Sequence, residues 1–215
     1  RFTGKNSIFS GEDFFLPFIG NYQLENLALA LKTLDIIFQT NPLVYSKNKK
    51  LFPINQSLFV EKVKEGIQKT RWPGRFELIN YKGLRLILDG AHNEEGMREL
   101  TKNLHEYCDK YTIITIFACN KDKDYQEMLD LLIPVTDYFI LTKSHVQIKA
   151  TEPEFLAKYL INLNKDHQIV TDYSQTIKFA SKILSERNFN NEKVLVCICG
   201  SLYLVGAIRS IINEV

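Results

Sequence analysis

The sequence predicts an α/β fold in which a mostly parallel sheet carries helices on both faces. From Phe76 to the end of the chain, short apolar runs of strand length alternate with segments whose apolar residues recur at helical spacing. Parallel neighbours in a sheet need a crossover connection, and a helix between successive strands provides one. In addition, 45% of the 215 residues are hydrophobic and 24% are charged, which is typical of a globular protein with a sizeable core.

The first part of the chain has a different pattern. Residues 1–20 are aromatic and rich in glycine, which predicts short strands and loops. Apolar residues at helical spacing from Leu24 to Phe38 predict a long helix, which Asn41-Pro42 ends. A polar loop follows, and a second, shorter helix is expected to begin near Ser57.

The helical periodicity breaks at Arg71-Trp72-Pro73-Gly74-Arg75, which we take as a domain boundary between residues 1–71 and 72–215. Residues 76–81 and 84–89 then predict two strands joined by a Lys-Gly turn, and therefore a hairpin with one antiparallel strand. The remaining predicted strands lie near 112–118, 138–142, 168–171 and 193–199, and the five predicted helices near 94–106, 125–132, 153–163, 174–185 and 202–212.

Helix starts are marked by capping residues. Asn93 is expected to cap the helix near 94–106. Thr151 and Glu154 fit a capping box, and Pro153 suits the first turn of the helix that follows.

The composition argues against several functional classes. Lys+Arg 27 against Asp+Glu 25 leaves a formal charge of +2, too small to suggest a nucleic-acid-binding surface. No apolar stretch reaches the roughly eighteen residues of a membrane span. The four cysteines lack C-x-x-C spacing, and Cys197 and Cys199 share one face of a buried strand, so we expect core thiols in a reducing cytosol. Because the chain does not begin with methionine, we expect a fragment or a processed piece.

Residues that could bind an anion follow the last strand. Neither G-x-G-x-x-G nor G-x-x-x-x-G-K-[ST] occurs, so the usual phosphate-binding loops are not predicted here. Gly200-Ser201 is the nearest substitute, because backbone N–H groups at a helix start can hold an anion. A simple tight turn is the alternative.

Asp89 and His92 lie in the loop between the second hairpin strand and the next helix, where ligands bind in α/β proteins. The Asp89 carboxylate could accept hydrogen bonds from ribose hydroxyls, or it could serve the turn or cap the helix. His92 could contact a phosphate or a base, or act as a structural hydrogen-bonding group. The residue pattern leaves both alternatives open.

Two further stretches carry charge at this end of the sheet. Arg75 follows Pro-Gly, and its guanidinium suits a phosphate, with a salt bridge to Glu77 as the alternative. Residues 120–124, Asn-Lys-Asp-Lys-Asp, end a strand and are expected to line the same sheet edge as Asp89. Their carboxylates could bind Mg²⁺ through water, but a solvated loop is the favoured interpretation. No metal-ligand spacing of histidines or cysteines is present.

Five sequence motifs follow one another over nearly the whole chain. Residues 20–26 are similar to G-x-H-Q-x-x-N, and residues 72–77 and 88–93 read WPGRFE and LDGAHN. Residues 117–124 are similar to F-G-x-x-x-D-K-D, and residues 200–206 to G-S-L-Y-L-x-G. Together these motifs resemble the folylpolyglutamate synthase family, whose pattern is shared by bifunctional dihydrofolate synthases. WPGRFE and LDGAHN resemble the start of the family's carboxy-terminal domain, and the last motif resembles its end.

The resemblance implies a fold and a reaction. The family belongs to the Mur ligase superfamily, three-domain enzymes that use ATP to convert a carboxylate into an acyl phosphate, which an amine then attacks. Residues 72–215 would form the carboxy-terminal domain, a Rossmann-like, mostly parallel six-stranded sheet with about five helices. Residues 1–71 would be the tail of the central ATPase domain. The implied substrates are ATP, L-glutamate and a folate or dihydropteroate, in a cytoplasmic, monomeric ligase.

The resemblance also assigns residues. Asn26, Arg75 and Asp89 match positions that contact ATP, and His92 matches a motif position that could bind the nucleotide or take part in catalysis. The family's phosphate-binding loop, Mg²⁺ ligands and modified lysine belong to sequence upstream of Arg1. The chain alone is therefore expected to be inactive and to supply no metal ligand.

On the substrate side, the resemblance points to Lys149 and Ser201. The sequence also departs from the family pattern. Tyr22 replaces a usual histidine, Ala118 replaces a usual glycine, and Ile148-Lys149-Ala150 stands where the family tends to show Pro-Arg-Ala. A lysine keeps the positive charge but lacks the planar fork of arginine, which leaves that contact open.

Three rival functions remain. One is a peptidoglycan-precursor ligase of the same superfamily, which would add an amino acid to a nucleotide-linked muropeptide. A second is a non-catalytic nucleotide-binding module. A third, a dinucleotide-dependent oxidoreductase, fits the fold alone and lacks the glycine fingerprint.

Overall fold

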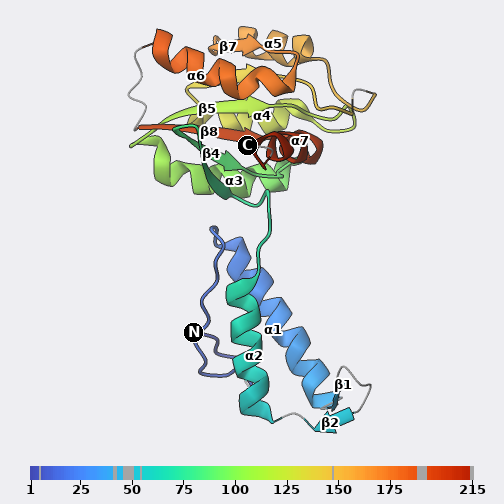
Figure 1. Cartoon of the computed structure of the whole chain (residues 1–215). Coiled ribbons are helices and arrows are strands. Elements are labelled where there is room, and N and C mark those ends of the chain that lie inside the picture. The colour runs from blue at the N-terminus through green and yellow to red at the C-terminus, as the bar shows by residue number, and fades with distance from the viewer. Residues whose placement is uncertain are drawn as a thin grey trace. The chain divides into compact units, whose positions relative to one another are not determined.

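The computed structural model describes residues 1–4, 6–40, 43–45, 51–53, 55–146, 148–187 and 193–213. The chain divides into two compact units, Arg1–Arg71 and Trp72–Val215 (Figure 1). Their assignment to the central and carboxy-terminal domains of a ligase stays a prediction.

The first unit contains two helices, α1 (Tyr22–Thr40) and α2 (Gln56–Lys69), and a short antiparallel pair, β1 (Leu43–Tyr45) and β2 (Leu51–Pro53). Both predicted helices are confirmed. The β1–β2 pair forms in the stretch that we expected to be a polar loop. Helix α2 begins one residue before Ser57, because the Asn55 side chain caps it by accepting hydrogen bonds from the backbone N–H groups of Ser57 and Leu58.

The prediction of short strands within residues 1–20 is wrong, because the described part of this segment consists of turns and irregular backbone. Gly11 has a φ of 82°, which ends any extended run, and the amide of Gly11 donates to the carbonyl of Phe2 at 2.9 Å. The aromatic residues serve packing instead: Phe9 is fully buried with Leu31 and Val60 in a small core.

The second unit contains a six-stranded sheet in the order β3-β4-β8-β5-β6-β7. Strand β3 is antiparallel to β4, and the other pairings are parallel, which confirms the predicted mixed sheet. Lys82 and Gly83 join β3 to β4 with φ values of 50° and 83°, as a hairpin turn with two left-handed residues requires. The strands are β3 (Glu77–Tyr81), β4 (Leu84–Leu88), β5 (Thr112–Phe117), β6 (Tyr138–Leu141), β7 (His167–Ile169) and β8 (Val194–Cys199).

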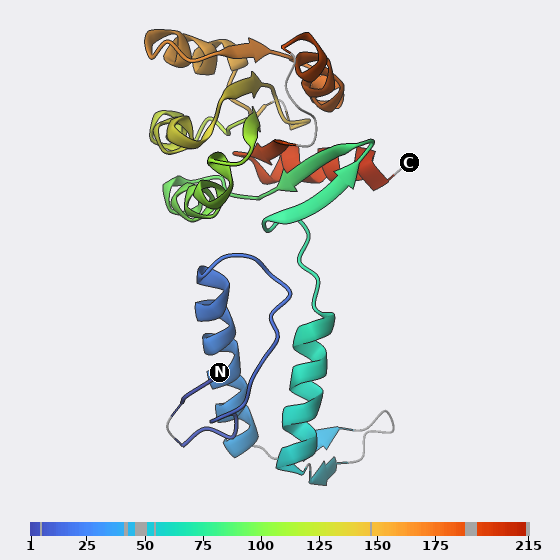
Figure 2. The same cartoon turned by 90° about the vertical axis from the view of Figure 1, so that its left-hand side faces the viewer.

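Five α-helices of this unit cover both faces of the sheet, as predicted. They are α3 (Glu94–Cys108), α4 (Tyr125–Leu132), α5 (Pro153–Asn162), α6 (Thr176–Glu186) and α7 (Leu202–Asn213). Figure 2 shows α3, α4 and α5 on one side of the sheet and α6 and α7 on the other. Apolar side chains fill the core between the sheet and α6 and α7, with Leu86, Ile114 and Val196 among its completely buried residues. Burial of apolar surface on the two faces of the sheet stabilises the fold.

The capping residue predicted for α3 is confirmed, and the capping box predicted for α5 is not formed. Asn93 caps α3 by accepting a hydrogen bond from the Gly96 amide at 2.9 Å. The capping box predicted at Thr151 and Glu154 is wrong. Glu152 occupies the cap position of α5 without a side-chain hydrogen bond, and the buried Thr151 hydroxyl has no partner among the described residues.

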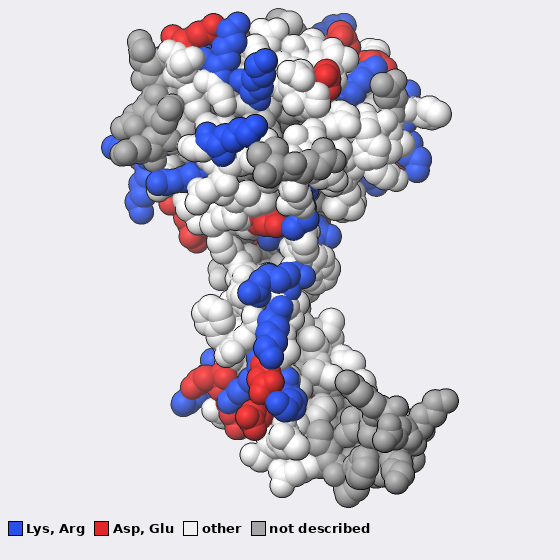
Figure 3. Space-filling model, in the orientation of Figure 1, with Lys and Arg blue, Asp and Glu red and all other residues white. Residues whose placement is uncertain are grey.

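The surface carries both kinds of charge. On the face drawn in Figure 3, Lys and Arg side chains are interspersed with Asp and Glu among neutral residues. In the part of the chain that the structure describes, no helix is long and apolar enough to cross a membrane. The four cysteines are free thiols, and Cys119, Cys197 and Cys199 are buried in the core.

Candidate functional site

A pocket of about 640 Å³ lies at the carboxyl edge of the sheet, which we define as the loops that follow β4, β5, β6 and β8. Four segments far apart in the sequence contribute to it because parallel strands end at the same edge. The lining residues are His92, Asn120, Lys121, Asp122, Lys123, Ile148, Lys149, Leu202 and Tyr203. The expected approach of residues 120–124 and the loop after β4 is confirmed.

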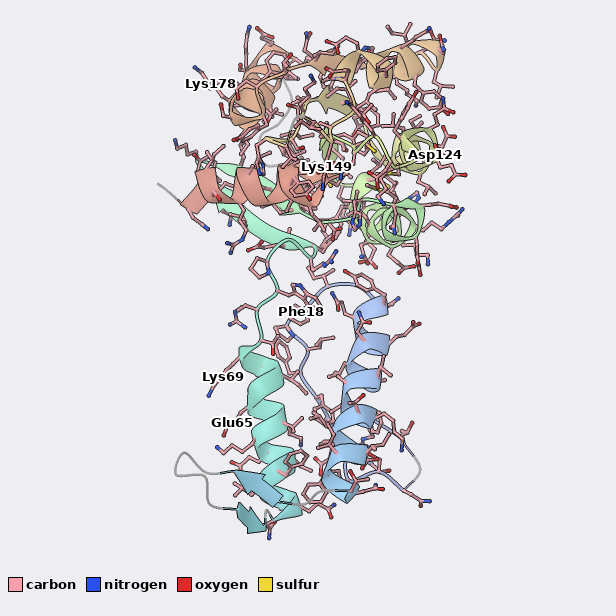
Figure 4. All side chains as sticks on the ribbon, turned by 90° about the vertical axis from the view of Figure 1, so that its right-hand side faces the viewer. Phe18, Glu65, Lys69, Asp124, Lys149 and Lys178 are labelled. Carbon is pink, nitrogen blue, oxygen red and sulfur yellow. The ribbon has the colours of Figure 1, made fainter. Side chains whose placement is uncertain are left out.

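Backbone hydrogen bonds fix the loops around this pocket. Asn120 and Ala150 form an isolated antiparallel bridge, and the Lys121 amide donates to the Lys149 carbonyl at 2.8 Å. The loop after β5 is thereby tied to the loop after β6. Figure 4 shows Lys149 near the N-terminal end of α7 and Asp124 at the start of α4.

Gly200 lets β8 end close to β5. Its φ is 92°, and a Cβ at this position would lie 2.2 Å from the carbonyl oxygen of Ala118. The glycine is therefore required both by the left-handed backbone and by the close approach of the two strands. It places Ser201 and the N-terminus of α7 beside the pocket. The tight turn expected at Gly200-Ser201 is therefore present, and it does not prevent the backbone N–H groups at the start of α7 from binding an anion.

The pocket is basic. Lys123 forms an ion pair with Asp122 at 3.1 Å, and this hydrogen-bonded contact lowers the pKa of Asp122. Among the described residues, no carboxylate lies within salt-bridge distance of the ammonium groups of Lys121 and Lys149. The Lys149 Nζ instead lies over the Tyr203 ring, 5.7 Å from its centre. Two unpaired ammonium groups at one pocket favour an anionic ligand.

Several buried polar atoms at the carboxyl edge have no hydrogen-bond partner among the described residues. They are the Asn120 Oδ1 and the hydroxyl oxygens of Ser144, Thr151 and Ser201. Asn120 lines the pocket, and Ser201 is 1% exposed beside the lining residue Leu202. Because an unsatisfied buried polar atom costs about 1–3 kcal/mol, such groups commonly mark a ligand or water site.

Asp89 is buried at the end of β4, and both of its carboxylate oxygens are engaged by backbone. Oδ2 accepts from the Phe76 amide and Oδ1 from the Ala91 amide, each at 2.8 Å. Burial raises the pKa of Asp89, and the two N–H donors and the nearby Arg75 oppose that rise. Of the two alternatives left by the sequence, the structure supports a role in the turn. Helix α3 is capped by Asn93 instead.

The turn that Asp89 holds is strained at Phe76. This residue has a φ of 44°, an uncommon conformation for a bulky side chain, and it is buried. Because β3 is antiparallel to β4, the start of β3 meets the end of β4, and Asp89 binds the Phe76 amide across that junction. The Gly90 amide adds a 2.7 Å hydrogen bond to the Gly74 carbonyl.

Arg75 leaves its guanidinium without a hydrogen bond or ion pair among the described residues. Its Cζ lies 5.8 Å from the centre of the half-exposed Trp72 ring. The alternative salt bridge to Glu77 is not formed, because Glu77 pairs with Arg209 through both Nε and Nη2 and also accepts from the Gly74 amide at 2.8 Å. A free guanidinium stacked on an aromatic ring is suited to bind a phosphate.

His92 lines the pocket, and its Nδ1 lies 2.8 Å from the Gly90 carbonyl. Because a carbonyl only accepts, Nδ1 carries the proton in this contact and Nε2 remains an acceptor in the neutral ring. The structural alternative for His92 is thus observed, and it leaves the second nitrogen available.

Asn26 lies in the first unit, exposed on α1, and its amide donates to the buried Gln23 at 3.3 Å. Asn26 therefore belongs to a different unit from Arg75 and Asp89. Its predicted contact with ATP stays a prediction.

The stretch 120–124 is structured by its own polar groups. Asp124 caps α4 by accepting from the amides of Gln126 and Glu127, and Asp122 pairs with Lys123. Among the residues that the structure describes, no group of three or more His, Cys, Asp and Glu side chains could hold a metal ion. These observations support the solvated-loop interpretation.

Lys121 belongs to the stretch 120–124 that was expected at this sheet edge, but Tyr203 was not predicted as a pocket residue. Tyr203 lies in a recognised motif, but a tyrosine does not indicate binding by itself. The position of Tyr203 two residues after Ser201, in the first turn of a helix, could have indicated it, since side chains there flank the helix N-terminus.

The comparisons with known proteins agree with this architecture. A family model described as the C-terminal domain of dihydrofolate synthetase matches residues 75–211. A probable dihydrofolate synthetase from Schizosaccharomyces pombe is 30% identical over 201 residues, covering 90% of this chain and 43% of the relative. The dihydrofolate synthetase of Saccharomyces cerevisiae is 26% identical over 213 residues, covering 93% and 46%. The chain therefore spans less than half the length of these relatives.

A more distant relative is a UDP-N-acetylmuramoyl-L-alanyl-D-glutamate–2,6-diaminopimelate ligase from Clostridium acetobutylicum, 26% identical over 136 residues, or 59% of this chain and 28% of the relative. The similarity to this ligase covers a smaller share of the chain than the similarity to the two dihydrofolate synthetases.

Solved structures share the fold. A Mycobacterium tuberculosis folylpolyglutamate synthase complexed with ADP aligns with a TM-score of 0.76 at 22% identity, over 94% of this chain and 42% of that protein. A Yersinia pestis bifunctional folylpolyglutamate synthase/dihydrofolate synthase with Mn, AMPPNP and L-glutamate bound aligns at 0.65 and 20%, over 95% and 43%. With the family model covering most of the second unit, the chain belongs to the family of dihydrofolate synthetase C-terminal domains.

Proposed function

We propose that this chain is part of an ATP-dependent ligase that adds L-glutamate to the γ-carboxyl group of a folate or to the carboxyl group of dihydropteroate. Residues 72–215 would supply the site for the incoming glutamate and part of the nucleotide site. Residues 1–71 would be the tail of the central ATPase domain. Both acceptors are carboxylic acids that would receive the amino group of glutamate.

The observation that carries the proposal is the basic pocket at the carboxyl edge of the sheet. L-Glutamate has two carboxylates and one ammonium group. The unpaired ammonium groups of Lys121 and Lys149 suit the carboxylates, and the unpartnered Asn120 Oδ1 can accept from an ammonium group. The Ser201 hydroxyl, at the N-terminus of α7, can donate to a carboxylate.

Arg75 supports the nucleotide side of the proposal. Its free guanidinium can bind a phosphate, whereas Asp89 has both oxygens occupied by backbone amides. We therefore propose that Arg75 binds the phosphates of ATP, and that Asp89 chiefly holds the turn that presents Arg75. Any contact between Asp89 and ribose would use the remaining lone pairs of its oxygens. The predicted contact of Asn26 with ATP is a separate part of the proposal.

The proposed reaction has two steps. The substrate carboxylate attacks the γ-phosphorus of ATP, which forms an acyl phosphate and releases ADP. The glutamate amine then attacks the acyl carbon, phosphate leaves, and an amide remains after loss of one proton from nitrogen. In this scheme, Lys121, Lys149 and Ser201 orient glutamate. The Nε2 atom of His92 is an acceptor for a proton of the glutamate ammonium group.

A divalent metal is expected for such a reaction, and it would neutralise charge on the transferred phosphoryl group. The residues that the structure describes include no group of three or more His, Cys, Asp and Glu side chains that could hold the metal, so these residues do not fit it by themselves. We therefore assign Mg²⁺ no ligand here. A monomeric state and a cytoplasmic location, consistent with four free thiols, complete the proposal.

A binding experiment on the chain itself tests the glutamate site. Isothermal titration with L-glutamate should give saturable binding, and D-glutamate, L-glutamine and meso-diaminopimelate should bind at least about tenfold more weakly, because each misplaces or lacks a charge that the pocket pairs. Tighter binding of diaminopimelate would favour the peptidoglycan-precursor ligase instead. A chain that binds ATP but binds none of these amino acids would favour the nucleotide-binding module.

Turnover is tested on the natural protein that contains this chain. ATP, L-glutamate and either dihydropteroate or tetrahydrofolate are supplied, and the ADP and the glutamylated product are measured. Product from dihydropteroate identifies dihydrofolate synthase activity, and product from tetrahydrofolate identifies polyglutamylation. If neither acceptor yields ADP or product, the proposed function is refuted.

A further inference from the structure

On the side of the pocket formed by α7, three aromatic rings contact one another in a row, and the first of them lies beside an ammonium group. The Tyr203 ring lies in the first turn of α7 and is 36% exposed. Lys149 Nζ is 5.7 Å from the centre of this ring. Lys149 comes from the loop after β6, and Tyr203 comes from the helix that follows β8, so the contact joins two walls of the pocket.

The Tyr203 ring is itself held in place. The His145 ring meets it edge-on, with 6.0 Å between ring centres and an interplanar angle of 86°. His145 in turn meets Tyr173 at 6.3 Å and 61°. Tyr203 is therefore braced by His145 and Tyr173, and it cannot move away from Lys149 without disturbing that packing.

Lys149 needs such a support because of its chemistry. Its ammonium is a point charge on a flexible stem, without the rigid planar fork of arginine, and no carboxylate of the described residues anchors it. A ring face attracts a cation electrostatically and limits the positions that the stem can adopt. A restricted ammonium loses less conformational freedom when it binds a carboxylate.

We propose that Tyr203 is a positioning residue that holds the Lys149 ammonium group at the pocket, ready to meet a carboxylate of the incoming glutamate. The inference rests on the proposed function, because it takes glutamate as the ligand. It adds Tyr203 as a residue that governs glutamate affinity through Lys149 without needing to touch the substrate.

The test combines binding with a double-mutant cycle. Loss of the ring in Tyr203→Leu should raise the Kd for L-glutamate about three- to fivefold by isothermal titration, whereas Tyr203→Phe should bind like the parent chain. In a Lys149→Gln background, Tyr203→Leu should cause no further loss, because the ring then has no cation to hold.

A second readout reports the geometry directly. The Cε methylene protons of Lys149 should show an upfield ring-current shift in the NMR spectrum of the parent chain and of Tyr203→Phe, and they should lose it in Tyr203→Leu. A general loss of structure would change many signals in the spectrum, and not only the signal of the Lys149 methylene protons. Tyr81→Leu is the matched control, because Lys82 Nζ lies 5.1 Å from the Tyr81 ring in the hairpin, away from the pocket. Its glutamate affinity should be unchanged.

The outcomes separate the inference from the proposed function. Glutamate binding that is equal in the parent chain and in Tyr203→Leu would overturn the inference alone. Equal losses from Tyr203→Leu with and without Lys149 would also overturn it, as would an unchanged Lys149 methylene shift. Failure of the parent chain to bind L-glutamate would overturn both.

Discussion

Two neighbouring regions of the carboxyl edge of the sheet differ in how their polar groups are satisfied: the junction of β3 and β4, which we call the β4 end, and the loops after β5 and β8, which we call the pocket end. At the β4 end, the buried Asp89 uses both oxygens to bind backbone amides, and Glu77 is held by Arg209. At the pocket end, buried oxygens of Asn120 and Ser201 have no partner among the described residues. The β4 end is therefore built for internal stability, and the pocket end keeps bonding capacity for a ligand.

The β4 end should lose the most stability when its carboxylate is removed. Asp89→Ala leaves two buried amides, those of Phe76 and Ala91, without acceptors, and we expect it to lower the free energy of unfolding by about 3 kcal/mol. Urea unfolding monitored by circular dichroism measures this. Asp124→Ala is the control, because that carboxylate caps α4 at an exposed site and should cost only about 1 kcal/mol. If Asp89→Ala leaves the free energy of unfolding unchanged, the β4 end does not depend on its carboxylate for stability, and the proposed difference from the pocket end is wrong.

The Glu77–Arg209 pair should show a smaller coupling. It fixes β3 to α7 with a two-pronged contact at 3.1–3.3 Å, but both side chains are partly exposed, so solvent screening reduces its strength. A double-mutant cycle with Glu77→Gln and Arg209→Met should give a coupling energy of about 1 kcal/mol in urea unfolding. The coupling should fall in high salt, and a coupling that persists unchanged would contradict a screened ion pair.

The pocket end should respond in the opposite way to removal of a polar group. Ser201→Ala deletes a hydroxyl without a described partner, so we expect a stability change within about 0.5 kcal/mol. The Kd for L-glutamate should nevertheless rise about tenfold. Ser210→Ala is the matched control in the same helix, where the hydroxyl bonds the Gly206 carbonyl away from the pocket lining. If Ser201→Ala binds glutamate like the parent chain, the hydroxyl is not part of the site.

The pH dependence of the free energy of unfolding that Asp89 causes should be the smallest of these effects. The amide donors and Arg75 oppose the effect of burial on the pKa of Asp89. The pKa of Asp89 is raised in the folded state, so its contribution to stability is complete below the unfolded pKa of about 4 and declines as the pH rises through the folded value. The asparagine side chain in Asp89→Asn has no titratable proton in this pH range. The stability of the parent chain relative to Asp89→Asn should therefore decrease from acidic to neutral pH. An increase would mean that the amide donors outweigh burial.

The fold could be predicted from the sequence because its signals are local. The apolar runs 112–118 and 193–199 are strands, and the hairpin turn at Lys82-Gly83 follows from residues that adopt left-handed backbone. Where a local signal competed with tertiary structure, the prediction failed. Thr151 resembles a helix cap, yet it is drawn into the loop pairing of Asn120 with Ala150 and becomes buried.

The candidate site was predicted less completely because its chemistry depends on pairing in space. Asp89 and Arg75 were identified, but nothing local indicates that two amides saturate Asp89 or that Arg209, over a hundred residues away, takes Glu77 from Arg75. Tyr203 was passed over because a tyrosine in a helix is ordinarily a packing residue. Its role depends on a lysine from another loop.

The position of β8 in the sheet has a consequence for how the protein is made. This strand is the last of the described strands in the sequence, yet it lies between β4 and β5 and pairs with both. During synthesis, β4 and β5 lack the strand that pairs with both of them until Val194–Cys199 has left the ribosome. The sheet can therefore close only late, through contacts of high sequence separation, which predicts slow folding and exposed strand edges on the nascent chain. A chain that stopped before Val194 would lack the centre of its sheet rather than one edge.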